Sequence, residues 1–232
     1  MKISQVVRMG VLSAGVLYMS TAQSIPTLQL DIAGGTYIGG DEESTITNDQ
    51  VFTLYAYATP GNVSAADILS ETYYLSVALS PKVSSPGSLG SFTVNGTVIN
   101  ATGDMNYGTP PLGATANPLL GSHDIFDTYY SEFAFQFDPA NTMTAYNVQD
   151  DSAGSGDMFY QAFNIDMTGL AEGYDLHFDL YSMQLKKNGN ITLDDFAPFS
   201  HDAGTSVPEP ASLALIGIGL LGFSARARMF RF

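Results

Sequence analysis

The feature that most constrains the fold of this 232-residue chain is a period-two alternation of apolar and polar side chains. Residues 132–137 place three phenylalanines on one face, and residues 158–165 and 176–181 alternate in the same way. Successive side chains of a strand point to opposite faces, so this spacing predicts strands and argues against helices. Further strand-like runs, rich in β-branched and aromatic residues, are 27–32, 51–58, 73–79, 92–99 and 143–148.

Turn signals separate these runs. Asn95-Gly96 is the residue pair typical of a two-residue hairpin turn, whereas residues 64–69 hint at one helical turn capped by Ser64. About eight strands with a turn every ten or so residues predict a single antiparallel β-sandwich, jelly-roll-like, over residues 23–206. The chain has no cysteine, but a body of this length can bury a core without disulfides.

The N-terminal end has the three parts of a secretory signal peptide, which we assign to residues 1–22. Lys2 and Arg8 supply the positive region, and residues 9–19 form an apolar run too short to span a bilayer. Small residues then precede a predicted cleavage between Ala22 and Gln23. The body is therefore expected to be exported.

The C-terminal end, residues 207–232, also has three parts. Val207-Pro208-Glu209-Pro210 leads into the apolar run 211–225. As a helix this run would be about 22 Å long, short for the roughly 30 Å hydrocarbon core, and we expect it to span the membrane. Arg226, Arg228 and Arg231 follow as a stop-transfer cluster, which places the C-terminus in the cytoplasm and the body outside the inner membrane.

This tail resembles the PEP-CTERM sorting signal of Gram-negative bacteria, in which Pro-Glu-Pro precedes a membrane helix and an Arg-rich end. The resemblance implies an exosortase, a membrane-embedded transpeptidase-like protease, as the partner that recognises Val207–Pro210 and processes the precursor. A plain C-terminal membrane anchor is the alternative, and it has the same topology. The resemblance implies a membrane-anchored precursor and then a cell-surface or extracellular protein.

The body itself resembles a group of exported bacterial proteins called choice-of-anchor N, whose members carry varied C-terminal anchors. Four segments carry this similarity: 25–32, 52–57, 103–111 and 196–202. The group has no assigned activity, so the resemblance implies surface display and no mechanism.

Charge and histidine content limit the chemistry of the body. The whole chain has 8 basic and 23 acidic residues, a formal net charge of -15, which excludes a typical nucleic-acid binder. Ser122-His123-Asp124 and Ser200-His201-Asp202 repeat a tripeptide, but a Ser-His-Asp triad converges from separate segments. His123 and His201 with Asp124 and Asp202 remain a possible metal set. Loop histidines bonded to neighbours are the simpler interpretation, and His177 is expected to face solvent.

Acidic and aromatic residues supply two further hypotheses. Asp150, Asp151 and Asp157 are weak candidates for calcium ligands, and such carboxylates are also the residue type of a glycosidase pair. An exposed stacking surface for carbohydrate is a further possibility, built from Tyr73, Tyr74, Tyr129, Tyr130 and Tyr181.

We therefore expect no catalytic residue, no metal and no cofactor, calcium being the open exception. The leading hypothesis is an exported, non-catalytic surface or extracellular-matrix protein sorted by an exosortase. The alternative is a calcium-dependent carbohydrate-binding module that acts on exopolysaccharide.

Overall fold

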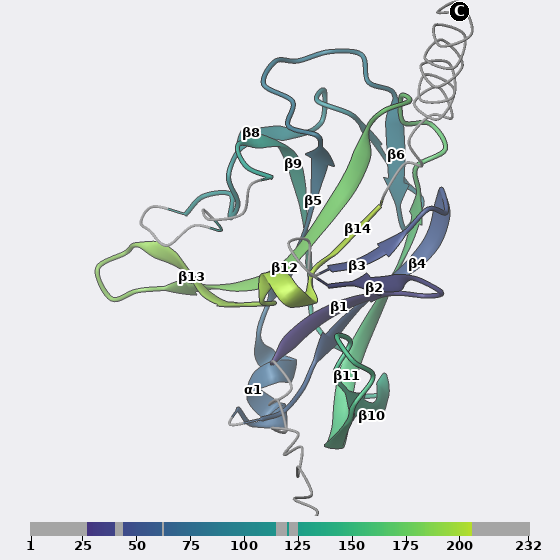
Figure 1. Cartoon of the computed structure of the whole chain (residues 1–232). Coiled ribbons are helices and arrows are strands. Elements are labelled where there is room, and N and C mark those ends of the chain that lie inside the picture. Colours follow the sequence, from purple (N-terminus) through teal and green to yellow (C-terminus); the bar gives the residue numbers. More distant parts are fainter. Residues whose placement is uncertain (1–26, 40–43, 62, 115–119, 121–124, 206–232) are drawn as a thin grey trace, which may run out of the picture.

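The alternating runs form two β-sheets that pack face to face (Figure 1). A computed structural model describes residues 27–39, 44–61, 63–114, 120 and 125–205. The predicted signal peptide and the predicted C-terminal helix lie outside these residues, as do His123 and Asp124. None of the helices in the described ranges is long and apolar enough to cross a membrane.

The first sheet, sheet A, has the order β1-β4-β11-β6-β7, with β10 paired to β11. Its strands are β1 (Leu28–Ile32), β4 (Val51–Ala58), β6 (Ser91–Val94), β7 (Thr97–Asn100), β10 (Thr142–Tyr146) and β11 (Ala153–Asp166).

The second sheet, sheet B, has the order β2-β3-β14-β12-β5-β9-β8, with β13 paired to β12. Its strands are β2 (Thr36–Ile38), β3 (Ser44–Thr47), β5 (Tyr73–Ser80), β8 (Asn106–Gly108), β9 (Thr128–Phe135), β12 (Asp175–Leu185), β13 (Ile191–Phe196) and β14 (Ala203–Thr205). Described pairings are antiparallel except β3 with β14, which is parallel. One helix, α1 (Ala65–Ser70), and one short 3₁₀ turn, η1 (Phe199–His201), complete the part of the chain that the structure describes.

The core lies between the two sheets. Phe52 of sheet A and Phe178 of sheet B meet edge to face with ring centroids 6.0 Å apart. Leu176, Phe178 and Leu180 of β12 point into this core, as the period-two pattern predicts. Burial of these large side chains on two facing sheets is the main stabilising contribution to the sandwich.

The structure confirms the predicted β-sandwich and the main local signals. Asn95 and Gly96 have φ of 50° and 78° and join β6 to β7, as a type I′ turn requires. The Ser64 side chain accepts a hydrogen bond from the Asp67 backbone N–H and caps α1. Five short or polar strands have no counterpart among the predicted runs: β2, β3, β8, β13 and β14.

The outer face of sheet B is covered, which the alternation did not predict. A second apolar cluster lies on it, built from β5, β9 and β12 together with β13 and the chain before β9. Its buried members are Ala78, Leu120, Phe126, Tyr130, Tyr181 and Leu193. Strand β12 is therefore buried on both faces over most of its length.

Candidate functional site

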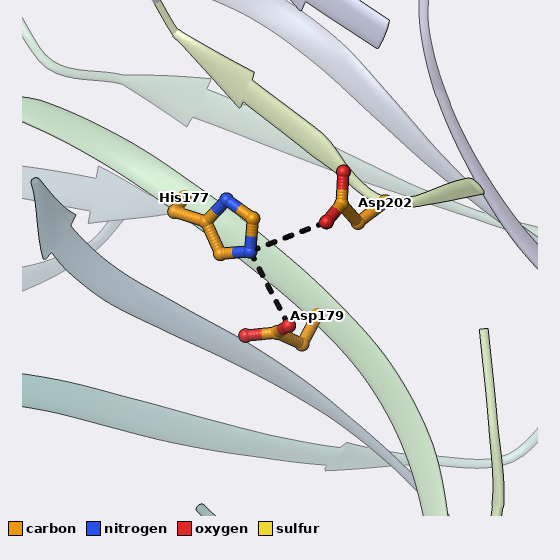
Figure 2. Close-up of side chains that lie close together, drawn as sticks. All are labelled: His177, Asp179 and Asp202. Carbon is orange, nitrogen blue, oxygen red and sulfur yellow. Dashed lines mark hydrogen bonds and ion pairs between the residues drawn. The ribbon is translucent and has the colours of Figure 1, made fainter. Parts of the chain in front are cut away.

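Strands β12 and β14 bring three ionisable residues together on the outer face of sheet B. His177 and Asp179 are two residues apart on β12, so they share the face opposite Leu176 and Phe178. Strand β14 pairs Gly204 with His177 and Ala203 with Phe178. Continuing this antiparallel register places Asp202 beside Asp179, and the side chains of all three residues meet between the strands (Figure 2).

The contact runs through one ring nitrogen. Nε2 of His177 lies 3.3 Å from Oδ1 of Asp179 and 3.6 Å from Oδ2 of Asp202 (Figure 2). Each of these three residues is at most 6% exposed. Among the described residues, this is the group of His, Asp and Glu side chains close enough to share a metal ion.

The expectation that His177 faces solvent is wrong. The alternation correctly places its side chain opposite Phe178, but the second apolar cluster and the neighbouring β14 bury that face. A strand pattern tells which face a residue occupies, and it does not tell whether another layer covers that face. The i, i+2 spacing of His177 and Asp179 was the available signal for this cluster. The pairing of β12 with β14 could not be predicted from the sequence, because β14 is only three residues long.

Polar atoms continue across the same face. Ser76 of β5 is the cross-strand partner of Asp179, and Glu132 of β9 is the partner of Ser76. Oδ2 of Asp179 and Oγ of Ser76 are buried and have no hydrogen-bond partner. Glu132 accepts hydrogen bonds from the Tyr181 hydroxyl and from the Leu112 N–H. Burial raises the pKa of the Glu132 carboxyl, against these two hydrogen bonds, which lower it.

His201 occupies a different buried site on η1. Its Nε2 lies 2.8 Å from Oδ1 of Asn147, and its Nδ1 lies 2.8 Å from Oγ of Ser200. Burial lowers the pKa of this imidazole, and the nearby Asp150 raises it to a smaller extent. The structure brings Asp202 to His177. His123 and Asp124, the other members of the metal set proposed with His201 and Asp202, lie outside the described residues, so that set stays a prediction.

The weak calcium candidates are exposed, and they do not share one loop. Asp150 lies in a turn and Asp151 directly follows it, whereas Asp157 lies within β11 opposite Thr144. In the described chain these carboxylates do not gather into a group of three within 4.8 Å. Hydrogen bonds from Ser152 lower the pKa of Asp150. Asp157 is separated from the other two because residues 153–157 belong to β11, and calcium binding by these carboxylates stays a prediction.

The tyrosines predicted as a stacking surface are largely buried. Tyr73 packs in the core, and Tyr130 and Tyr181 lie in the second apolar cluster. Tyr74 and Tyr129 remain partly exposed.

A different tyrosine group lies on the outer face of sheet A. Tyr55 and Tyr57 stack with centroids 5.9 Å apart, and Tyr160 meets Tyr55 edge to face. The Tyr146 hydroxyl donates a hydrogen bond to Asp31 at 2.6 Å, and its oxygen lies 3.1 Å from the Tyr57 hydroxyl oxygen. Tyr55 and Tyr160 are partly exposed, so part of this group reaches the surface. The alternation in residues 51–58 and 158–165 was the signal for it.

Strand β14 ends at Thr205, and the segment that follows it matches a family model. Residues 206–228 match the PEP-CTERM protein-sorting motif. The PEP-CTERM tail implies processing by an exosortase, a membrane protease, and export with a membrane-anchored precursor in a Gram-negative bacterium. Comparisons with curated proteins and with solved structures find no match.

Proposed function

We propose that the chain is an exported, non-catalytic cell-surface or extracellular-matrix protein that an exosortase sorts through its PEP-CTERM tail. The observation that carries this proposal is the match over residues 206–228, directly after the last strand of the sandwich. The order of a signal peptide, a folded body and a sorting tail supports it. The similarity of the body to the choice-of-anchor N group also favours surface display.

The buried state of the two histidines that the structure describes supports a non-catalytic role. His177 and His201 are 6% and 3% exposed, and a general base must reach the proton of a bound substrate. His201 contacts the side chain of Ser200, its own neighbour in sequence, and Asn147. Both ring nitrogens of His201 therefore have a side-chain partner within the protein, which is typical of a histidine that stabilises a fold.

The sorting proposal is tested by following the full chain in a bacterium with and without its exosortase gene. We expect the protein to leave the inner membrane only in the strain that carries the exosortase. A chain that reaches the surface equally well in both strains would contradict the proposal. Blotting of inner-membrane, outer-membrane and medium fractions gives the distribution.

The second candidate function is a carbohydrate-binding module, calcium-dependent, that acts on exopolysaccharide. The tyrosine group on sheet A favours it, because stacked and partly exposed rings are suited to bind the apolar face of a sugar. A glycan array in the presence and absence of calcium tests it. Replacing Tyr55 and Tyr160 with alanine should then abolish binding, while Tyr107→Ala, an exposed tyrosine on β8, should leave it unchanged.

A further inference from the structure

Strand β14 is an interior strand of sheet B, and it is also the last strand before the sorting tail. It lies between β3 and β12 and pairs with both of them (Figure 1). In the strand order of sheet B, β2 and β3 come beyond β14, so they are joined to the centre of the sheet through it. The C-terminal end of the folded body is therefore fixed inside a sheet.

Hydrogen bonds fasten this strand up to its last residue. Oγ1 of Thr205 accepts a 2.9 Å hydrogen bond from the Leu176 N–H and lies 3.2 Å from Oδ1 of Asp175. At the start of the strand, the Thr45 N–H donates a 3.2 Å hydrogen bond to the Asp202 carbonyl. The body thus holds the chain up to the residue that directly precedes the PEP-CTERM match.

The sorting motif begins very close to this fixed end. Pro208 is the third residue after Thr205. Three residues of chain span at most about 11 Å in any conformation. A globular body the size of residues 23–206 has a radius of gyration of roughly 16 Å. The tether is therefore shorter than the radius of the body, and the folded body crowds a membrane-embedded protease that reads the motif.

The segment that ends in β14 is held by little hydrophobic burial. The Ala197 N–H is bonded to the Leu180 carbonyl at 2.8 Å, and residues 198–205 follow. The one large apolar side chain in this segment, Phe199, is only partly buried. The residues of the segment that are buried are polar or small: His201, Asp202, Ala203 and Gly204. Water replaces most of the hydrogen bonds that such a segment loses, so it can open locally before the apolar core strands do.

We propose that residues 198–205 form a releasable strap, and that opening of this strap from sheet B sets the rate at which the exosortase processes the precursor. The inference rests on the proposed sorting function and adds a regulatory step to it. Opening back to Ala197 lengthens the tether to Pro208 from three residues to eleven, which span at most about 40 Å. When opening and closing are fast relative to cleavage, the cleavage rate follows the population of the open form. The folded body therefore delays the removal of its own anchor.

A flexible spacer tests this proposal in cells. Eight glycine and serine residues inserted between Thr205 and Ser206 add as many residues as the strap contains, and they leave the strap itself intact. Pulse-chase labelling should show that this chain is processed at least about 10-fold faster than wild type, because its motif no longer depends on the rare open form. The matched control has the same spacer between Asn188 and Gly189, in the exposed turn between β12 and β13, and should be processed at the wild-type rate.

Two substitutions should change strap opening in opposite directions. Gly204→Ala restricts the open chain, and its Cβ would make an ordinary contact 3.6 Å from the Leu176 carbonyl oxygen. It should slow processing about 2- to 5-fold. Thr205→Val leaves the Leu176 N–H without its acceptor and should speed processing about 2- to 10-fold. Both effects should disappear in the chain with the spacer after Thr205, because its motif is already accessible.

The same chains in a strain without the exosortase gene separate this inference from the sorting proposal. Cutting of wild type at equal rates in both strains would contradict exosortase sorting, and the strap's role would fall with it. Exosortase-dependent cutting that is equally fast with and without the spacer after Thr205 would overturn the strap alone. Unchanged rates for both substitutions in the chain without a spacer, or equal acceleration by the control spacer, would also overturn it.

Discussion

The hydroxyl of Tyr146 donates a 2.6 Å hydrogen bond to Oδ2 of Asp31, and this bond joins β10 to β1 across 115 residues of sequence. Gln29 makes two more contacts between the same segments, donating to the Tyr146 carbonyl and accepting from the Val148 N–H. Burial raises the pKa of Asp31, and the Tyr146 hydrogen bond lowers it because it stabilises the charged form. The bond is therefore the chief compensation for burying this carboxylate.

Replacing Tyr146 with phenylalanine should lower the free energy of unfolding by about 1 to 3 kcal/mol, because it leaves a half-buried carboxylate without its donor. The loss should shrink in acid, where Asp31 is protonated. Urea denaturation at neutral and acidic pH measures both effects. Tyr107→Phe is the control because Tyr107 is 53% exposed. Its free energy of unfolding should stay within about 0.5 kcal/mol of the wild-type value. An equal loss at both pH values would contradict the role given to Asp31.

Glu132→Gln should stabilise the protein at neutral pH. Burial raises the pKa of Glu132, so the folded state binds a proton more tightly than the unfolded state does. Its charged form therefore costs stability, and this cost appears as the pH rises from the unfolded pKa through the folded one. A glutamine oxygen can still accept the hydrogen bonds from Tyr181 and Leu112.

The measurement is the difference in unfolding free energy between Glu132→Gln and wild type across pH. We expect no difference below the ordinary glutamate pKa and a growing advantage of the variant above it. A variant that is less stable at neutral pH and equal to wild type in acid would show that the charged carboxylate is favourable in the fold.

Gly90 and Gly96 provide a matched pair of left-handed glycines. Gly90 has φ of 83°, and a Cβ there would lie 2.0 Å from the Gly169 carbonyl oxygen. Gly96 has φ of 78°, and its Cβ would meet nothing within 4 Å. Alanine at either position adds about 1 to 2 kcal/mol of backbone strain, and at Gly90 it adds overpacking of about 1 to 3 kcal/mol more. The midpoint of thermal unfolding should be well below that of Gly96→Ala in the Gly90→Ala variant. Equal decreases in the midpoint would contradict the close contact at Gly90.

The sequence predicted the parts of this fold that follow from local patterns. The alternation in residues 51–58 predicts β4 over the same residues, and Asn95-Gly96 predicts the β6–β7 turn. Strand β14 is only Ala203-Gly204-Thr205, too short and too polar to show an alternation. Its parallel pairing with β3 brings together residues 158 positions apart, such as Ala203 and Thr45, which no local pattern can show.

The site was less predictable than the fold. The sequence analysis grouped Asp202 with its neighbour His201. In the structure His201 belongs to η1, whereas Asp202 leads into β14, so the two adjacent side chains contact different residues. The cluster with His177 exists because β14 pairs with β12, and its burial exists because a second layer covers sheet B. Both features depend on tertiary contacts, which a local sequence pattern does not show. The sorting tail could be recognised from sequence because its motif, apolar run and arginines are contiguous.

We predict that the tail is a transient anchor and that its recognition depends on Pro208, Glu209 and Pro210. Two prolines fix φ near -65° and donate no backbone hydrogen bond, so the motif should stay extended for a protease to read. Each arginine of the cluster costs roughly 2.5 to 3.5 kcal/mol at mid-membrane, which should hold the tail until cleavage. Glu209→Ala should therefore leave export intact and accumulate uncut in the inner membrane. Glu172→Ala, an exposed glutamate of the body, is the control.

Mass spectrometry of the C-terminus of the mature protein shows whether the tail has been removed. Wild type and Glu172→Ala, isolated from the cell surface or the medium, should lack the apolar run and the arginines, while Glu209→Ala in the inner membrane should retain them. A wild-type protein that still ends at Phe232 in its final location would show that the tail is not a transient anchor.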